Sequence, residues 1–467
     1  MQTKVKNWQV LPVRAEHLVG WCLGGIILLA SALRLYHIDF QSLWYDELHS
    51  VVPTGPNSTF ESIINYSRTD QPPLFFIYLH YAFVWFGYDS MTARVAAAVI
   101  GILGVPAVYW LGYEVSQKKE IGLMAAFLVA TNYFCIYYSQ EVRFYSMCFL
   151  LSTLSYCFYL RSYRTQNPTD FVGYIVTTVG LLYTHYYGII LYATQALTFI
   201  ILLRGKPGKR FIFISVLSGL LIFILFWPWI PTVLQDAGIS SFWIKSPSPF
   251  FFFEYFYDYT GKDAITSLVL ISLLIIYLRY RNISISKLYY PSREILGWWI
   301  VFSYAIPYVR SITSTPILHP RYTIVTLPAL LVLSAVGWAI LSSTVWKRVS
   351  LVLLLVGIIV NFSFFKQPYT RITKDQFREA SQFVRERNNN LPIYSTFSWH
   401  YNFYFRDSVN KVQPLSINNL QADSFWLLQG QLSEEDAQAE INKLTVNYQI
   451  VDSGTFFGTK ALLFKRL

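Results

Sequence analysis

The sequence carries little charge for its length. Asp, Glu, Lys and Arg together make up only 13% of the 467 residues, whereas a typical soluble domain carries roughly 25%. Hydrophobic residues make up 54% and are gathered in long runs. Because a membrane-spanning helix needs roughly 20 mainly apolar residues, the missing charge and the long runs together predict an integral membrane protein.

Cysteine is also scarce, and the common nucleotide-binding motifs are absent. The four cysteines lie inside apolar runs and form no CxxC pair, so the sequence disfavours structural disulfides and a zinc site. It contains no GxxxxGK[ST], GxGxxG, GxSxG or HExxH pattern. The missing phosphate loop disfavours an ATP-driven transporter and a cytosolic nucleotide-sugar site.

The net charge of +11 resides in the connections between the apolar runs. Basic clusters such as Lys118-Lys119 and Lys347-Arg348 are separated from one another by pairs of runs, which is the pattern of cytoplasmic loops. This placement disfavours nucleic acid as a partner and predicts a multi-pass protein of the cell inner (plasma) membrane. Lys4, Lys6 and Arg14 precede the first run and predict an uncleaved signal anchor with a cytoplasmic N-terminus.

We predict about eleven spans and an outer C-terminus. The expected spans are residues 19–35, 94–113, 121–138, 143–160, 171–184, 187–203, 211–230, 264–279, 295–310, 322–342 and 349–365.

Two segments lie outside this series of spans. The stretch from Leu74 to Phe86 is too short to cross comfortably, so we predict an interfacial or re-entrant helix in a long outer loop, residues 36–91. After residue 365 charged and amide residues become frequent. We therefore expect a transmembrane domain over 1–365 and a small extracytoplasmic α/β domain over 366–467, with helices at Gln376–Arg387 and Ser433–Leu444.

Acidic residues mark the first outer loop. Asp46 and Glu47 are adjacent and flanked by aromatics just after the first span, and Asp70 precedes the Pro72-Pro73 pair. Carboxylates at a membrane surface are costly unless solvated or used, and one of them could take a proton from a hydroxyl group. The alternatives are a solvated loop end for Asp46 and Glu47 and a helix cap for Asp70.

Tyrosines surround an ionisable pair at another outer boundary. Tyr138, Gln140, Glu141 and Arg143 lie there, and we predict that the first three bind substrate and that Arg143 binds a phosphate. A structural Glu141–Arg143 pair or a snorkelling arginine is the alternative.

Later outer boundaries add further candidates. Arg321 and Tyr322 open a late span where an arginine is unusual, which predicts a phosphate partner, and Arg310 is a weaker candidate of the same kind. An arginine contacting ordinary lipid headgroups is the alternative. His185 and His319 are candidate substrate contacts, although a lone histidine is more often a packing residue. Their spacing gives no support for a metal site, so we predict no metal and no required cofactor.

These segments, in this order, resemble the bacterial members of the protein O-mannosyltransferase-like superfamily (glycosyltransferase family 39-like). Its members are multi-span GT-C glycosyltransferases related to lipid A aminoarabinose transferases and dolichyl-phosphate-mannose protein mannosyltransferases. The resemblance covers roughly residues 15 to 345 and rests on Trp44-Tyr45-Asp46-Glu47, Asp70-Gln71-Pro72-Pro73-Leu74, Arg94-Val95-Ala96-Ala97-Ala98, Gly104-Val105-Pro106, Tyr138-Ser139-Gln140-Glu141-Val142-Arg143-Phe144-Tyr145 and Pro320-Arg321-Tyr322.

The resemblance implies a GT-C fold and transfer of a sugar from a polyprenyl-phosphate donor on the outer face. The first-loop aspartate of the family corresponds to Asp46, the expected general base with Glu47 as alternate, and its second acid corresponds to Asp70. Many relatives have histidine where this chain has Gln71, which puts a metal or proton role at that position in doubt. The acceptor could be a lipid, a glycan or a protein.

Two other functions stay open on the sequence. One is a membrane transporter or lipid flippase without transferase activity, which would favour internal repeats and charges near the membrane midplane. The other is a binding or scaffold protein that works through its external domain, whose role would survive loss of the acidic pair.

Overall fold

Two compact units make up the chain. The computed structural model describes residues 13–238, 243–280 and 291–467. The helical unit comprises Met1–Tyr36, Ala97–Gln140 and Phe144–Lys366, and the loop–sheet unit comprises His37–Ala96, Glu141–Arg143 and Gln367–Leu467. The expected first outer loop and the expected C-terminal domain therefore belong to one unit.

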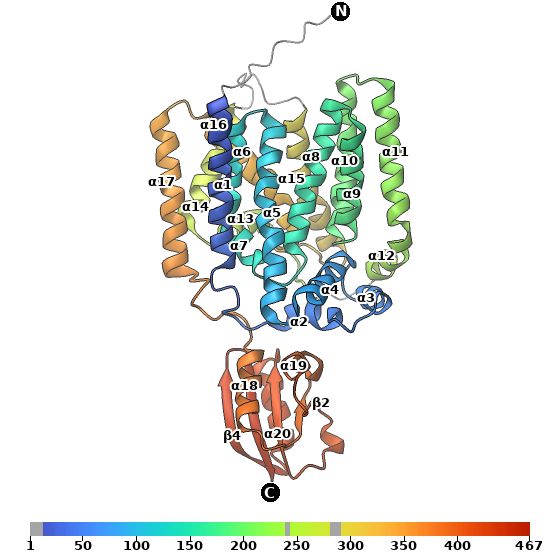
Figure 1. Ribbon diagram of the computed structural model, residues 1–467, viewed down its shortest axis with the longest axis vertical. Helices are drawn as coiled ribbons and strands as arrows, with labels where there is room; N and C mark the ends of the chain where they lie inside the picture. The colour runs from blue at the N-terminus through green and yellow to red at the C-terminus, as the bar shows by residue number, and fades with distance from the viewer. Residues whose placement is uncertain (1–12, 239–242, 281–290) are drawn as a thin grey trace, which may run out of the picture. The chain divides into compact units, whose positions relative to one another are not determined.

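Long apolar helices run side by side in the helical unit (Figure 1). Most of α5 (Ser90–Ser116) belongs to this unit. Its other elements are α1 (Val13–Leu35), α6 (Lys119–Thr131), α7 (Tyr133–Ser139), α8 (Tyr145–Thr165), α9 (Pro168–Leu182), α10 (Tyr187–Arg204), α11 (Lys209–Phe226), η2 (Trp227–Trp229), α12 (Ile230–Ala237), α13 (Phe251–Tyr259), α14 (Ala264–Tyr280), α15 (Ser292–Thr313), η3 (Tyr322–Thr326), α16 (Leu327–Ile340), α17 (Thr344–Val360) and η4 (Asn361–Phe365).

Each predicted span coincides with a helix or a bent pair of helices. Within the described residues, seven helices are long and apolar enough to cross a membrane, or up to nine if each bent pair counts as one span. The other two predicted spans are α8, which is rich in serine and tyrosine, and α9, which has only 15 residues. The predicted multi-pass α-helical fold is confirmed. Lys4, Lys6 and most of the basic connection from Arg279 to Arg293 lie outside the described residues.

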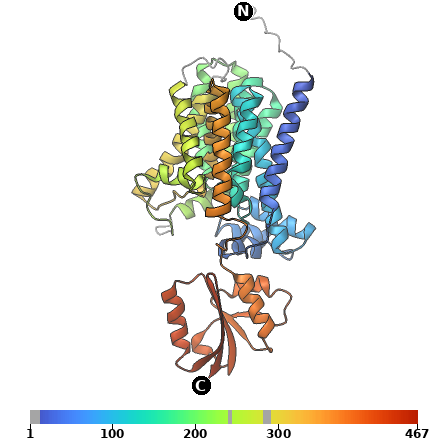
Figure 2. The same cartoon turned by 90° about the vertical axis from the view of Figure 1, so that its left-hand side faces the viewer.

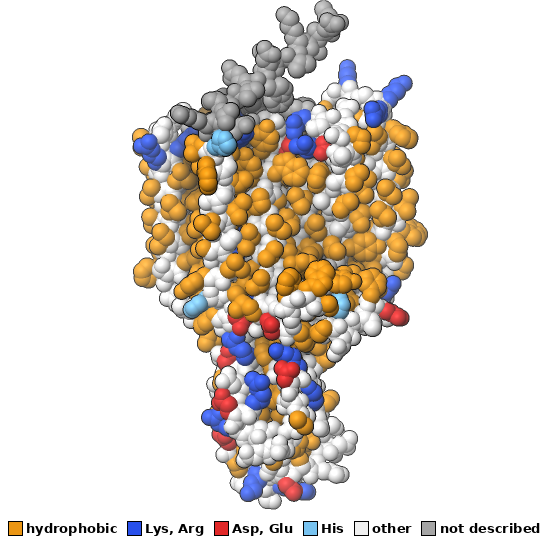
Figure 3. All heavy atoms as spheres, in the orientation of Figure 1, with side chains coloured by type: hydrophobic (Ala, Val, Ile, Leu, Met, Phe, Trp, Pro, Cys, Tyr) orange, Lys and Arg blue, Asp and Glu red, His pale blue; other side chains and the backbone are white. Residues whose placement is uncertain are grey.

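The outside of the helical unit is apolar. Figure 3 shows hydrophobic side chains over the long helices and Lys and Arg gathered at one end of that unit. Large apolar residues are widely exposed there, including Trp21 at 79%, Phe213 at 69% and Val176 at 63%. So large an exposed apolar area is unfavourable in water, and it fits contact with lipid.

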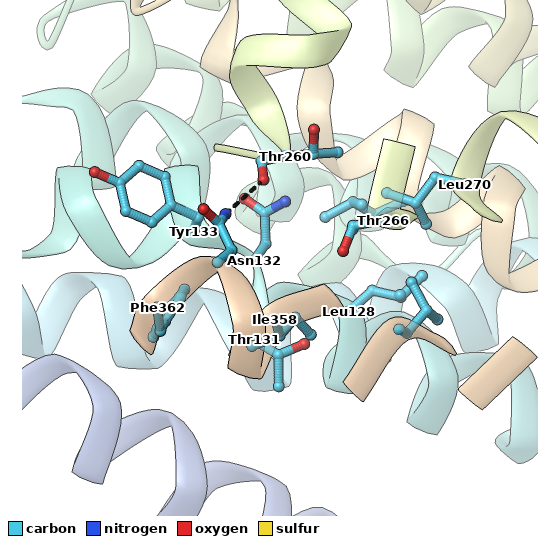
Figure 4. Close-up of a pocket in the computed structure, with 12 residues that line it drawn as sticks. Leu128, Thr131, Asn132, Tyr133, Thr260, Thr266, Leu270, Ile358 and Phe362 are labelled. Atoms are coloured by element: carbon cyan, nitrogen blue, oxygen red, sulfur yellow. Dashed lines mark hydrogen bonds between the residues drawn. The ribbon is translucent and has the colours of Figure 1, made fainter. Parts of the chain in front are cut away.

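Two bent helix pairs meet inside the helical unit. The α6–α7 pair bends by 60° and the α13–α14 pair by 115°. Asn132 lies at the first break and donates from Nδ2 to the Tyr259 carbonyl at 2.8 Å. Asn361 donates to the Thr260 carbonyl at the second break at 3.2 Å (Figure 4). These amides supply the hydrogen bonds that broken helices lose inside a membrane.

Arg34 completes this joint from α1. It is fully buried and donates to the Val129 and Ala130 carbonyls, at 2.9 and 3.0 Å, in the last turn of α6. The pocket beside the joint has a volume of about 10 Å³ and is lined by residues such as Asn132 and Thr266. That is room for about one water molecule, so the pocket belongs to the helix joint and is too small for a substrate.

The loop–sheet unit combines short helices with a five-stranded sheet. Its loop part contains α2 (Tyr45–Val51), η1 (Val52–Thr54), α3 (Phe60–Ser67) and α4 (Leu74–Phe86). The bounds of α4 are those of the predicted short helix. Its C-terminal part contains α18 (Phe377–Arg387), β1 (Ile393–Ser395), α19 (Ser398–Tyr404), β2 (Val412–Pro414), η5 (Ile417–Asn419), β3 (Ser424–Gly430), α20 (Glu434–Leu444), β4 (Tyr448–Phe456) and β5 (Thr459–Arg466).

The strands form one mixed sheet in the order β2-β1-β3-β5-β4. Helix α20 packs on one face through Ile441 and Leu444, against Phe425 and Phe464. Helix α18 covers the opposite face, where Phe383 contacts Trp426, and Figure 2 shows helices on both sides of the sheet. The alternating side chains of β3 are buried on both faces because helices cover both. The predicted small α/β domain and its two helices are confirmed.

The close packing of α14 against α16 predicts that Gly337 is sensitive to substitution. A Cβ on Gly337 of α16 would overlap the Leu273 carbonyl oxygen of α14, so the backbones would have to separate. We expect Gly337→Ala to destabilise the protein by about 1–3 kcal/mol, measured as a lower thermal midpoint in detergent. Gly297→Ala is the matched control, because nothing lies within 4 Å of a Cβ there. Equal midpoints for the two variants would contradict this packing.

Candidate active site

A buried carboxylate lies at the centre of the loop–sheet unit. Glu47, in the first turn of α2, is 0% exposed. Its Oε2 accepts from Arg94 Nη2 at 3.0 Å and from the Trp44 amide at 3.3 Å. Its Oε1 accepts from the Val142 amide at 2.9 Å and pairs with Lys374 Nζ at 3.1 Å. Both oxygens of Glu47 are therefore engaged by the protein.

The charges of two buried acids, Glu47 and Glu141, are matched by those of two buried bases, Arg94 and Lys374. Glu141, 1% exposed, lies 3.9 Å from Lys374 Nζ, and Arg94 is 2% exposed. Burial lowers the pKa of Lys374, and the neighbouring carboxylates of Glu47 and Glu141 oppose that shift. A cluster of this kind is stable only while the charges match, because an uncompensated buried charge is very costly.

The start of the C-terminal region holds the first loop in place. The Gln41 side-chain oxygen accepts from the Thr373 and Lys374 amides at 2.9 and 3.0 Å. Arg378 donates to the Asp39 and Phe40 carbonyls at 2.9 and 2.8 Å. The residues held by these bonds immediately precede α2, the helix that carries the acidic pair. Residues 373–378 therefore fix where that helix begins.

The other two predicted loop acids have a different environment. Asp70 forms a two-pronged pair with Arg143, with oxygen–nitrogen distances of 3.2 and 3.4 Å. Arg143 also donates to the Asp46 carbonyl and to Ser50 Oγ, each at 3.2 Å. Asp46 and Asp70 are partly exposed, whereas Glu47 is buried. The structure thus brings Asp46, Asp70 and Arg143 together and pairs the Arg143 guanidinium with the Asp70 carboxylate.

A further carboxylate approaches Asp46 from the C-terminal region. Asp375 follows Lys374 and packs against the backbone at Gly458. Burial raises the pKa of Asp375 to about 6, and the negative charge of Asp46 adds to the shift. Asp375 is not among the predicted site residues, although the Lys-Asp pair that follows the last predicted span is a visible signal.

In the helical unit, Arg321 lies among aromatic rings. Its guanidinium carbon is 4.4 Å from the centre of the Trp243 ring, 5.5 Å from Tyr322 and 5.8 Å from Tyr145. Three other predicted residues join this arginine–aromatic cluster. The His319 ring is tilted against that of Trp243 with centres 5.1 Å apart, and the His185 ring against that of Tyr322 at 4.8 Å. The Tyr138 ring meets that of Tyr145 edge-on at 4.8 Å. Trp243 is not among the site residues predicted from the sequence.

Two other predicted residues donate to backbone carbonyls. Gln140 donates from Nε2 to the Arg34 carbonyl at 3.0 Å, so its amide group caps the end of α1. Arg310 donates to the Ala237 carbonyl at 3.3 Å and lines an open groove of about 580 Å³ between α12 and α15. The groove is otherwise mostly apolar, with Phe302, Ile306 and Val309 in its wall.

Within the described parts of the chain, no group of three or more His, Cys, Asp or Glu side chains is placed to hold a metal ion. His185 and His319 are each engaged in ring contacts of the arginine–aromatic cluster.

Comparisons with known proteins agree with this architecture. The family described as dolichyl-phosphate-mannose-protein mannosyltransferase matches residues 70–230. The crystal structure of ArnT from Cupriavidus metallidurans in the apo state matches with a TM-score of 0.66, over 96% of this chain and 98% of that chain, at 12% identity. The chain has the GT-C fold. The GT-C fold that the resemblance implied is thereby confirmed.

Other solved GT-C structures support the same conclusion. ArnT from the same organism bound to undecaprenyl phosphate matches with a TM-score of 0.62 and 13% identity, over 96% of this chain and 98% of that chain. The apo oligosaccharyltransferase of Archaeoglobus fulgidus matches with a TM-score of 0.55 and 12% identity, over 94% of this chain and 70% of that chain. No curated protein sequence matches the chain significantly.

The buried position of Glu47 leads to a stability prediction. We expect Glu47→Gln to destabilise the GT-C chain by about 3 kcal/mol, because Arg94 and Lys374 would keep their charges after losing the carboxylate. Thermal unfolding in detergent measures the effect. Glu386→Gln on α18 is the control, because that side chain is 57% exposed. A midpoint for Glu47→Gln equal to that of the control would show that the cluster tolerates charge imbalance.

The raised pKa of Asp375 predicts a pH-dependent effect. Its folded-state pKa of about 6 exceeds the ordinary value of 3.8, so ionised Asp375 destabilises the fold above about pH 6, and the effect vanishes below about pH 4, where both states are protonated. We expect Asp375→Asn to raise the thermal midpoint relative to wild type at pH 8 and to leave it nearly unchanged at pH 4. The same offset at both values would mean that the substitution acts through packing.

Proposed function

We propose that the protein is a glycosyltransferase that moves a sugar from a polyprenyl-phosphate donor to an acceptor hydroxyl at the extracytoplasmic membrane face. The observation that carries this proposal is the contrast between two adjacent acids. Glu47 is enclosed and neutralised by the protein, whereas Asp46 is partly exposed beside the Asp70–Arg143 pair. Asp46 is therefore the acid of this pair that can reach a substrate.

In the proposed reaction the Asp46 carboxylate accepts the proton of the acceptor hydroxyl. The hydroxyl oxygen bonds to the anomeric carbon while the bond from that carbon to the phosphate oxygen breaks. The electron pair of the broken bond leaves with polyprenyl phosphate. Direct displacement inverts the anomeric centre, and a positioned base contributes roughly 10²–10⁴-fold to such a rate. Asp70 orients Arg143, and through it the Asp46 backbone.

The departing phosphate needs positive charge more than a proton donor. One candidate is Arg321, whose guanidinium lies against aromatic rings within the helical unit. Arg143 is the second, although binding a phosphate would compete with its pairing to Asp70. Tyr322, His185, His319 and Tyr138 would line the donor or acceptor site around Arg321, whereas the capping contact of Gln140 suits a structural role.

The lipid part of the donor requires an apolar surface. The groove on α15 offers one, with apolar walls and Arg310 at the end of the helix. The match to ArnT bound to undecaprenyl phosphate supports a lipid-linked phosphate as the donor class. Residues 1–365 would then carry the donor in the membrane, and residues 366–467 would be extracytoplasmic, as the charge distribution between spans indicates.

The central test is sugar transfer by the Asp46→Asn variant. Proteoliposomes containing the full chain are given a panel of radiolabelled polyprenyl-phosphate sugars, and label passing to an acceptor or to water is counted. We expect Asp46→Asn to lower transfer by about 10²–10⁴-fold, because the amide cannot accept the hydroxyl proton. Donor binding should be retained, since the amide leaves the arginines untouched.

Asp423→Asn serves as the matched control, because Asp423 is 90% exposed in the same unit. Full transfer by Asp46→Asn would reject Asp46 as the base. Saturable donor binding with movement of the intact lipid-linked sugar across the bilayer, and no release of sugar, would favour a flippase instead.

A further inference from the structure

Trp399 is a large aromatic residue with a partly open ring. It lies on α19 and is 39% exposed. Its ring is 5.5 Å from that of His49 and stacks near Tyr66 at 6.2 Å, with 29° between the planes. Part of the ring is thus fixed by neighbours from α2 and α3, while the remainder faces outward. A rigid, partly open aromatic face is a frequent feature of ligand sites.

The contacts of Tyr66 indicate which ring nitrogen of His49 carries the hydrogen. The Tyr66 hydroxyl lies 2.9 Å from the His49 carbonyl oxygen and also 2.9 Å from His49 Nδ1. A tyrosine has a single hydroxyl hydrogen. Both contacts are satisfied if that hydrogen goes to the carbonyl oxygen and the Nδ1–H of His49 donates to the tyrosine oxygen. His49 Nε2 is then a hydrogen-bond acceptor, and it has no partner among the described residues.

His400, next to Trp399, presents more unused polar atoms. Its side chain stacks on Tyr45, with ring centres 4.7 Å apart and planes at 23°, and lies 4.9 Å from His49. His400 is only 7% exposed, yet neither ring nitrogen has a hydrogen-bond partner within the described parts of the chain. Leaving such atoms unpaired is unfavourable. Burial, followed by the neighbouring His49, lowers the pKa of His400 to about 4, so the ring is neutral near pH 7.

Two of these rings, those of Tyr45 and His49, belong to the helix that carries the proposed base. Tyr45 precedes Asp46 on α2, and His49 lies three residues after it, on a neighbouring part of the helix surface. The charges of Asp46 and Asp70 both act on Tyr45 and His49. The aromatic rings, the unpaired nitrogens and the two carboxylates therefore occupy one region of the loop–sheet unit.

We propose that Trp399, His400, His49 and Tyr45 form the subsite that binds a sugar ring of the acceptor. This inference rests on the proposed transferase function and assigns the acceptor class, a glycan. A sugar ring offers an apolar C–H face to an aromatic ring and hydroxyl groups to histidine nitrogens and carboxylates. A serine or threonine side chain has no ring face to stack.

The position of Asp46 assigns this subsite to the acceptor. A general base must lie within hydrogen-bond reach of the hydroxyl that it deprotonates. That hydroxyl belongs to the acceptor, so a ring held beside Asp46 carries the reacting oxygen. Helix α19 belongs to the C-terminal region, which would therefore select the acceptor.

Direct binding tests the subsite without turnover. The full chain in lipid nanodiscs is mixed with a panel of methyl pyranosides and with N-acetyl-serine and N-acetyl-threonine methylamides. Saturation-transfer NMR then reports which molecules bind. We expect one or more pyranosides to bind wild type, Trp399→Ala to weaken that binding about tenfold and Trp399→Phe to retain most of it. Val409→Ala, at a residue 98% exposed in the same unit, should bind as wild type does.

Several results would overturn the proposal. They are the absence of pyranoside binding to wild type, equal binding by Trp399→Ala, and Trp399-dependent binding of the amino-acid amides alone, which would indicate a protein acceptor.

Transfer assays separate the acceptor from the donor. Trp399→Ala should raise the acceptor KM and leave release of the donor sugar to water unchanged. An equal loss of transfer to the acceptor and of release to water would assign Trp399 to the donor. Pyranoside binding that persists while Asp46→Asn keeps full transfer would refute the assigned base and leave the subsite intact.

Discussion

The buried carboxylate of Glu47 is the interaction on which the loop–sheet unit depends. It joins the start of α2, the Val142 amide, Arg94 and Lys374, segments that are far apart in the sequence. A fully buried charge is tolerated only when opposite charges and hydrogen-bond donors surround it. Glu47 therefore requires all of these segments to be present together, and their assembly positions Asp46, the next residue toward the N-terminus.

The two adjacent acids separate into different environments because they lie on a helix. Successive residues point about 100° apart around the helix axis, so a helix that buries Glu47 turns Asp46 toward the Asp70–Arg143 pair and the aromatic rings. In an extended loop, the directions of the Asp46 and Glu47 side chains would not follow from helix geometry. The same geometry places His49, three residues after Asp46, on a neighbouring part of the helix surface.

Much of the fold could be predicted because the signals are local. Apolar runs marked the spans, proline followed by a short run marked α4, and periodic apolar residues marked α18. The bends at Asn132 and Thr260 could not be predicted, since each depends on partners that satisfy the freed backbone groups. For the same reason the hydrogen bond by which Gln140 caps the end of α1 could not be predicted. Of the arginines predicted to bind phosphate, Arg321 lies in the arginine–aromatic cluster with several other predicted site residues.

The sequence by itself determined the membrane class, the GT-C resemblance and the candidate acids, because composition, run length and motif order are readable without a fold. Tertiary structure decided which acid is enclosed and which is open, and it brought Lys374, Asp375, Trp399 and His400 to a loop more than three hundred residues earlier. No local pattern encodes such contacts. They arise because a buried charge and a partly buried set of rings each need partners, and the folded chain supplies them from distant segments.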